Sequence, residues 1–262
     1  MLFAGRARRE EKEIRRMEKN ETREDTADVA RQRSNIYGLL ATIYREEVGK
    51  ALLKQIRHAR FQGALSHLGV QLGGEFLNLP EEKLIEDLAV EYARLFLGPG
   101  KHISPHESVH LTKEEGGGSL WGAATVKVKK CIECSGIEYK SGYRGMPDHI
   151  SVELEFMQEL TKREAQAWED KDQDTVFWCL KTEKRFIDEH ILLWIPLFCE
   201  KVIKDAELSF YREVAKLTKR FLEFEQRELE KYPSFQHVTV NEFDSHSSQD
   251  IDMARPPLLN PY

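Results

Sequence analysis

The sequence of 262 residues has few cysteines, no long apolar run and only a small excess of negative over positive charge. Four cysteines are too few for a disulfide scaffold in a chain of this length, which agrees with a reducing compartment. The longest strongly apolar run, Ile191 to Cys199, is much shorter than the roughly 20 residues that cross a bilayer, so no transmembrane helix is predicted. A formal net charge of −6 argues against a general binder of nucleic acid or anionic membrane.

The two ends of the chain differ from its middle. Residues 1–27 are almost wholly charged, and the pairs Arg8-Arg9 and Arg15-Arg16 lie among glutamates with no apolar stretch behind them. This predicts a solvated arm without an export signal, hence a cytoplasmic protein. Residues 233–262 lose helical periodicity and gain Ser, Asp and Pro, which predicts a disordered tail. The remaining residues, 28–232, are expected to form one domain.

The period of that domain is helical, and no repeat or alternating strand pattern interrupts it. Apolar residues recur at three- and four-residue steps from Ile36 to Val48 and again from Leu84 to Phe96. Asn78 and Glu81 predict a capping box at the start of the second helix, and Gly98-Pro99-Gly100 predicts its end. The sequence therefore predicts an all-α fold, a single-domain helical bundle with long loops.

Two loops are long enough to suggest a function. The first runs from Gly98 to about Leu120 and carries Pro105 and three consecutive glycines. After a helix from about Trp121 to Cys134, the second loop runs from Ser135 to Pro147, and Asp148 is expected to cap the following helix. The long segment after it, which includes His190 and Trp194, is predicted to be core-facing and to kink at Pro196.

Residue chemistry alone yields no convincing catalytic set. Cys131-x-x-Cys134 lacks the second ligand pair of a structural zinc site and falls at a helix end, so we interpret both cysteines as incidental. A metal-dependent hydrolase remains an alternative, built on Asp148 with the loop residues His102, His106, Glu107 and His110. Pro105 argues against the helix that a His-x-x-x-His pair requires. There is no phosphate loop for a nucleotide and no nucleophile elbow, and no cofactor is predicted.

Five blocks of sequence occur in the order and at the spacing of a known family. They are Glu91-Tyr92-Ala93-Arg94-Leu95-Phe96-Leu97-Gly98-Pro99, Pro105-His106-Glu107-Ser108-Val109, Pro147-Asp148-His149-Ile150, Glu153-Leu154-Glu155-Phe156-Met157 and the segment Phe186 to Phe198. Over about residues 28–230 the chain resembles the TorD/DmsD/NarJ-type redox-enzyme maturation chaperones.

The resemblance implies an all-helical, non-enzymatic chaperone. Such proteins bind the twin-arginine signal peptide, or the apo-form, of a molybdenum-cofactor oxidoreductase until the cofactor is inserted; the client can also be a subunit that is not exported. Carried over position by position, the implied peptide-binding residues are Tyr92, Leu95, Phe96, Pro105, His106, Glu107, Asp148 and His149. Some relatives have an aromatic residue in place of His106, which implies a different client preference. A homodimer formed by swapping is compatible with the long loops.

Physical reasoning supports the same surface. A signal peptide has a basic end and an apolar segment, so its receptor should offer an apolar groove with acidic residues nearby. Tyr92, Leu95 and Phe96 are expected to supply the apolar area, and Glu107 and Asp148 the negative charge. We expect His149, at the positive end of its helix, to be a neutral hydrogen-bonding group.

Overall fold

The computed structural model describes residues 23–67, 69–98, 100–111, 120–137 and 145–232, and within these ranges it contains helices and no strand. The arm at residues 1–22, the three glycines Gly116 to Gly118 and the tail at 233–262 lie outside the described residues. The α-helices are α2 (Arg23–Arg45), α3 (Lys50–Arg57), α4 (Ala59–His67), α5 (Gly74–Asn78), α6 (Glu81–Tyr92), α7 (Glu107–His110), α8 (Ala123–Cys134), α9 (Ile150–Asp170), α10 (Gln173–Phe186), α11 (Leu192–Asp205) and α12 (Ser209–Glu230). Two π-helical turns, η1 (Ala93–Leu97) and η2 (Ile187–Ile191), complete the set. The predicted all-α fold is confirmed.

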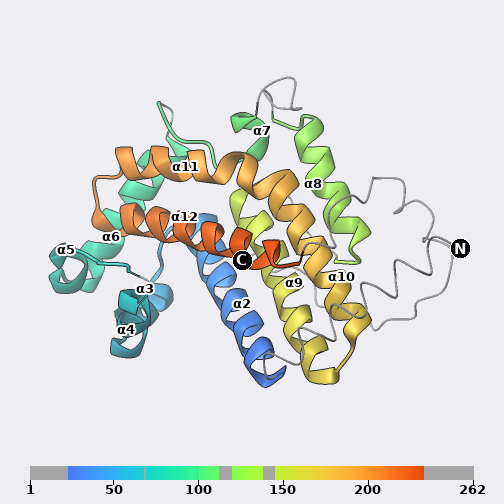
Figure 1. Cartoon of the computed structure of the whole chain (residues 1–262). Helices are drawn as coiled ribbons and strands as arrows, with labels where there is room; N and C mark the ends of the chain where they lie inside the picture. The colour runs from blue at the N-terminus through green and yellow to red at the C-terminus, as the bar shows by residue number, and fades with distance from the viewer. Residues whose placement is uncertain (1–22, 68, 99, 112–119, 138–144, 233–262) are drawn as a thin grey trace, which may run out of the picture.

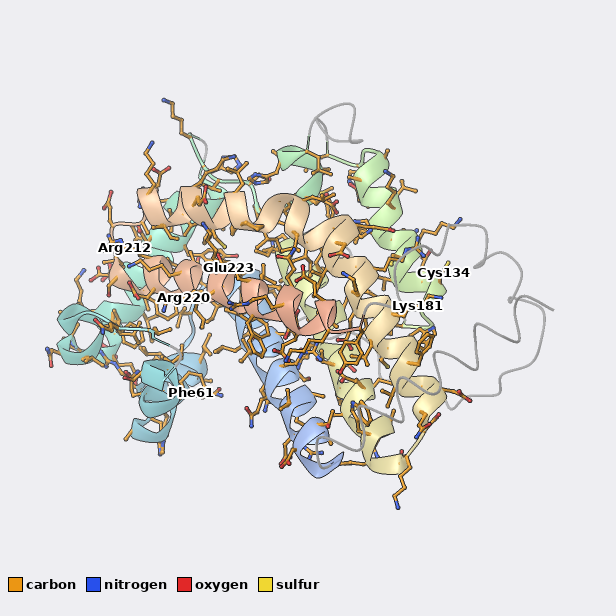
Figure 2. All side chains as sticks on the ribbon, in the orientation of Figure 1. Phe61, Cys134, Lys181, Arg212, Arg220 and Glu223 are labelled. Carbon is orange, nitrogen blue, oxygen red and sulfur yellow. The ribbon has the colours of Figure 1, made fainter. Side chains whose placement is uncertain are left out.

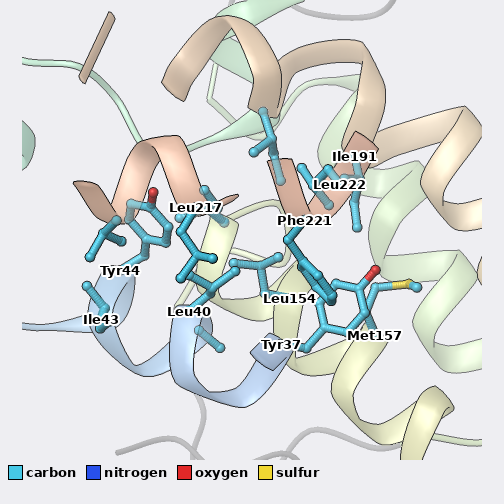
Figure 3. Close-up of a cluster of buried hydrophobic side chains, with 14 of the residues drawn as sticks. Tyr37, Leu40, Ile43, Tyr44, Leu154, Met157, Ile191, Leu217, Phe221 and Leu222 are labelled. Carbon is cyan, nitrogen blue, oxygen red and sulfur yellow. The ribbon is translucent and has the colours of Figure 1, made fainter. Parts of the chain in front are cut away.

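The core lies where α2, α9 and α12 meet. Figure 1 shows α2 beside α9, with α12 and α11 crossing above them. The apolar period predicted for α2 buries Tyr37, Leu40 and Tyr44 completely or nearly so, against side chains of α9 and α12 (Figure 3). The rings of Tyr37 and Phe221 meet edge to face, with centroids 4.7 Å apart. Aromatic and aliphatic burial of this kind is the dominant stabilising contribution. No helix of the described part combines the length and apolarity needed to cross a membrane.

A buried ionic cluster ties the same helices together. Arg33 on α2 contacts Glu164 of α9 at 2.6 Å, Glu183 of α10 at 2.5 Å and Glu225 of α12 at 2.7 Å. All four side chains are buried, and Tyr37 Oη donates a further hydrogen bond of 2.9 Å to Glu225. Burial raises the pKa of both Glu164 and Glu183, because their charged forms lose hydration. No local pattern in the sequence predicted this cluster.

Several predicted helix boundaries need correction. Helix α2 begins at Arg23 and buries Ala27, so packing starts before residue 28. The capping box at Asn78 and Glu81 is wrong: α5 ends at Asn78, and α6 starts after Pro80, whose φ of −52° suits a helix start without a side-chain cap. Trp121, predicted to begin a helix, lies outside α8 with a φ of +61°.

The long apolar segment is helical throughout but not α-helical throughout. Helix α10 leads into η2, where the Leu192 N–H bonds to the carbonyl of Ile187, five residues back, and α11 follows. Figure 1 shows α10 and α11 running in different directions on the two sides of this turn. Pro196, where a kink was predicted, lies within α11. The departure from α geometry occurs before it, in η2.

Candidate functional site

Two of the family blocks, far apart in the sequence, are paired by their backbones. His106 and His149 form an isolated antiparallel bridge, in which Ile150 N–H donates to Pro105 O at 2.9 Å and Glu107 N–H to Asp148 O at 3.0 Å. The two imidazole rings stand at 78° with centroids 5.0 Å apart. Of the eight predicted residues, Pro105, His106, Glu107, Asp148 and His149 are therefore brought together in one place.

In the two paired segments, His106 and His149 are the residues that are partly exposed. His149 is the N-cap of α9: its Nδ1 accepts the Ser151 N–H at 3.2 Å and lies 2.8 Å from Ser151 Oγ. Burial, with the charges of His106 and Arg45 nearby, lowers the pKa of His149 to about 3. Burial also lowers the pKa of His106. Both imidazoles are thus neutral at physiological pH, as predicted for His149, although burial outweighs the helix terminus as the cause.

The predicted role of Asp148 as a helix cap is wrong, because the next residue takes it. Asp148 is fully buried, and its Oδ2 accepts the backbone N–H of Ser108 at 3.0 Å, so it fastens α7 to the start of α9. Its Oδ1 has no hydrogen-bond partner within the described part of the chain. Asp148 therefore fixes the loop from the interior of the protein, and its carboxyl group does not reach the surface.

Glu107 anchors the same loop from the other side. It is buried, and His190 Nδ1 on η2 lies 3.2 Å from each of its carboxylate oxygens. Beside it, Glu153 accepts a hydrogen bond of 3.0 Å from Trp194 Nε1. Burial and the neighbouring Glu107 raise the pKa of Glu153 well above its usual value, which favours the protonated form. His190 and Trp194 are buried as predicted, but each also contacts an acidic side chain of the family blocks.

The remaining predicted residues, Tyr92, Leu95 and Phe96, lie in the core on the inner side of α6 and η1. Tyr92 Oη donates to Tyr44 O at 3.1 Å, and burial together with Glu47 and Glu46 raises the Tyr92 pKa to about 12. The predicted apolar groove formed by these three side chains is therefore not open in this conformation.

One aromatic residue joins this group to the loop. Phe198 of α11 stacks on Phe96 with centroids 5.9 Å apart and meets the His110 ring, also at 5.9 Å. His110 in turn lies 5.2 Å from Trp194. The loop after η1 also returns to it, since Ile103 N–H donates to Leu95 O at 2.7 Å. The blocks thus share one packed unit, with two histidines at its surface.

The metal alternative finds no support in this arrangement. His110 Nε2 donates to Ser104 O at 2.7 Å and its Nδ1 lies 3.3 Å from Lys201 Nζ, while His106 pairs with His149. His102 is exposed and directed to Gly100 O. Within the described ranges no three His, Cys, Asp or Glu side chains converge as metal ligands.

The cysteine pair lies far from the loop histidines. Cys131 and Cys134 occupy the last turn of α8, as predicted, and Figure 2 labels Cys134 at the end of that helix remote from α7. Burial raises the pKa of the Cys131 thiol to about 12, so it is not an activated nucleophile.

We expect the double substitution Cys131→Ser and Cys134→Ser to change the free energy of unfolding by less than about 1.5 kcal/mol, since the volume is nearly conserved. Urea unfolding and elemental analysis of the native protein check this. Stoichiometric zinc that disappears from the variant together with its stability would contradict it.

Comparison with known proteins agrees with this organisation. Residues 59–200 match the model of the nitrate reductase delta subunit family. The chaperone protein TorD of Vibrio vulnificus strain YJ016 is 24% identical over 201 residues, covering 72% of this chain and 91% of that protein. The chaperone protein TorD of Shewanella sp. strain ANA-3 is 26% identical over 217 residues, covering 78% and 97%. The family match spans more than half of the chain and includes the paired loops, so this protein belongs to the nitrate reductase delta subunit family, the TorD/NarJ-type redox-enzyme maturation chaperones.

Proposed function

We propose that this chain is a non-enzymatic, cytoplasmic assembly chaperone for a molybdopterin-containing oxidoreductase. It binds the twin-arginine signal peptide, or the apo-form, of the catalytic subunit until the cofactor is inserted. The observation that supports the proposal is the backbone pairing of Pro105–Glu107 with Asp148–Ile150, which brings two of the five family blocks together. The family match and the TorD relatives support the chaperone role.

Within this site we assign different roles to the exposed and the buried residues. His106 and His149 are partly exposed and neutral, so they can exchange hydrogen bonds with a peptide backbone. The other six residues hold them in position. Glu107 and Asp148 fasten α7 and the start of α9, and Pro105 contributes a bridge carbonyl. The aromatic group of Tyr92, Leu95 and Phe96 supports the loop through Phe198.

The test is calorimetric titration of the protein with a synthetic leader peptide from a neighbouring molybdoenzyme gene. We expect His106→Ala and His149→Ala each to weaken binding about fivefold, since one hydrogen bond contributes about 1 kcal/mol. His102→Ala is the matched control, because His102 is exposed in the same loop but outside the bridge. Unchanged affinity in both site variants, with intact thermal melts, would remove the histidines from the site.

The same titration separates apolar from ionic recognition. Replacing leucines of the peptide should weaken binding more than tenfold, because burying one such side chain yields about 1.5–3 kcal/mol. Replacing its arginines should cost under about 1 kcal/mol, and added salt should weaken binding only modestly. Since the pKa of His149 is about 3, its contribution should stay constant from about pH 5 to 8. A peptide without the arginine pair that still binds would favour a client that is not exported.

A further inference from the structure

The described surface carries a group of large apolar side chains that the described residues leave about half exposed. They are exposed by 44–64% and come from α7, the residues before α8, α8 itself and the outer side of α11: Val109, Leu120, Trp121, Val126, Leu193 and Leu197. Helix α7 packs on both α8 and α11, and both helices begin beside it and run away from it in different directions (Figure 1). We call these six residues the α7–α8–α11 apolar surface.

Trp121 makes this surface unlike scattered apolar exposure. It is 64% exposed and has a φ of +61°, a strained backbone angle for a residue with a large side chain. Backbone strain of this kind is found most often at functional sites. Trp121 precedes the N-cap Gly122 of α8, and Val126 is the fourth residue of that helix. These are the two positions that pair in a hydrophobic staple. Tryptophan is also the residue most enriched at the centres of interfaces. The surface therefore has the composition of a binding site.

Charge defines what this surface can accept. On both helices the apolar stripe ends in a lysine one turn further on: Val126 is followed by Lys130, and Leu197 by Lys201. Lys127 adds a third exposed ammonium group, and within the described residues no carboxylate pairs with Lys127 or Lys130. Lys201 Nζ lies 3.3 Å from Nδ1 of the neutral His110 ring, so its partner in the described part of the chain is not a carboxylate. An apolar centre with lysines at its ends favours a ligand that mixes apolar and acidic residues.

The chain itself contains such a ligand. Residues 233–262, which follow α12, carry four carboxylates against a single arginine, and Glu242 and Asp244 flank Phe243 just after Val238 and Val240. The other terminal segment, residues 1–22, has seven basic and five acidic residues and would be repelled by the lysines. Val238 and Asp244 follow Tyr232 by 6 and 12 residues, which span about 20 and 40 Å when extended. Helix α12 packs antiparallel to α11 and so ends on the side where α11 begins, which brings the segment toward this surface (Figure 1).

We propose that the segment around Val238 to Asp244 docks on the α7–α8–α11 apolar surface of its own chain. Phe243 and the two valines cover Trp121, Leu193 and Leu197, and Glu242 and Asp244 pair with the lysines. The contact goes beyond the proposed chaperone function, because it requires no client.

Zero-length carbodiimide cross-linking of the full chain, followed by peptide mass spectrometry, tests the contact. We expect cross-links from Lys127, Lys130 or Lys201 to Glu242 or Asp244, formed within one chain when labelled and unlabelled protein are mixed. Leu197→Ser removes neither reacting group, but it should lower the yield of these cross-links to about one tenth, the equivalent of about 1.4 kcal/mol. Leu77→Ser, a leucine of similar exposure on α5, should leave the yield unchanged.

Three outcomes would overturn the proposal. The first is that tail carboxylates react with Lys54 of α3 and with Lys171, the residue after α9, as readily as with the three named lysines. The second is a yield that is the same in Leu197→Ser and in the parent; Val126→Ser serves as a second variant if Leu197→Ser does not fold. The third is that cross-links join two copies, which would make the surface a dimer contact. None of these outcomes bears on peptide binding at His106 and His149, so the proposed function is tested separately.

Discussion

Replacing Arg33 with methionine is expected to lower the free energy of unfolding by about 3–5 kcal/mol, because removing one member of a buried ionic group leaves the others uncompensated. Arg33 is the cation that contacts all three buried carboxylates of its cluster, on α9, α10 and α12. Methionine keeps most of the volume, so the expected loss is electrostatic and not a cavity effect.

The control lies two residues earlier on the same helix. Arg31 is exposed and pairs with Asp28 and Glu169, so Arg31→Met should cost less than about 1 kcal/mol. The pH dependence has a definite sign. Burial already raises the pKa of Glu164 and Glu183 in the parent, and the loss of Arg33 should raise both pKa values further. The deficit of Arg33→Met should therefore grow with pH above the folded-state pKa of the parent carboxyls, where only the folded variant still holds the extra protons. Equal urea midpoints for the two variants would contradict the assignment.

Trp194→Ala should cost about 3–5 kcal/mol, the usual range for removing a large core side chain. Trp194 is fully buried, contacts the rings of His110 and Phe198, and donates its indole N–H to Glu153. Trp194→Phe keeps a ring and loses the donor, so it should cost less than the alanine variant but leave Glu153 short of a partner.

Leu77→Ala serves as the control, because that side chain is half-exposed on α5, outside the α7–α8–α11 apolar surface, and its loss should change stability by less than about 0.5 kcal/mol. Thermal melts of the three variants, read together with peptide titration, decide the case. If Trp194→Ala melted like the parent and yet bound no peptide, Trp194 would belong to the binding site and not to the core.

The helical part of the fold could be predicted because it depends on local periodicity. The stripe from Ile36 to Val48 specifies one buried face of α2, and the structure buries it. The partners of charged residues could not be predicted in the same way. Glu164, Glu183 and Glu225 look like solvated helix residues in the sequence, and only the packing of three helices brings them to Arg33.

The candidate site shows the same division. The family blocks indicated which residues matter, but not which of them would be exposed. Glu107 lies 83 positions from His190, so no local pattern revealed the pairing that buries it. Asp148 is a residue type typical of helix N-caps, yet its carboxylate accepts the Ser108 N–H and the N-cap of α9 is His149.

The two π turns have a consequence for how the family can vary. A π turn holds one residue more than an α-helical turn, so η2 in effect carries an inserted residue between α10 and α11. Deleting one residue there would restore an uninterrupted α-helix and rotate everything downstream by about 100°. Trp194 would then swing away from Glu153, and Phe198 from both Phe96 and His110. The packing of the site therefore depends on the length of this segment as well as on its composition, and a relative with one residue fewer here should assemble its site differently.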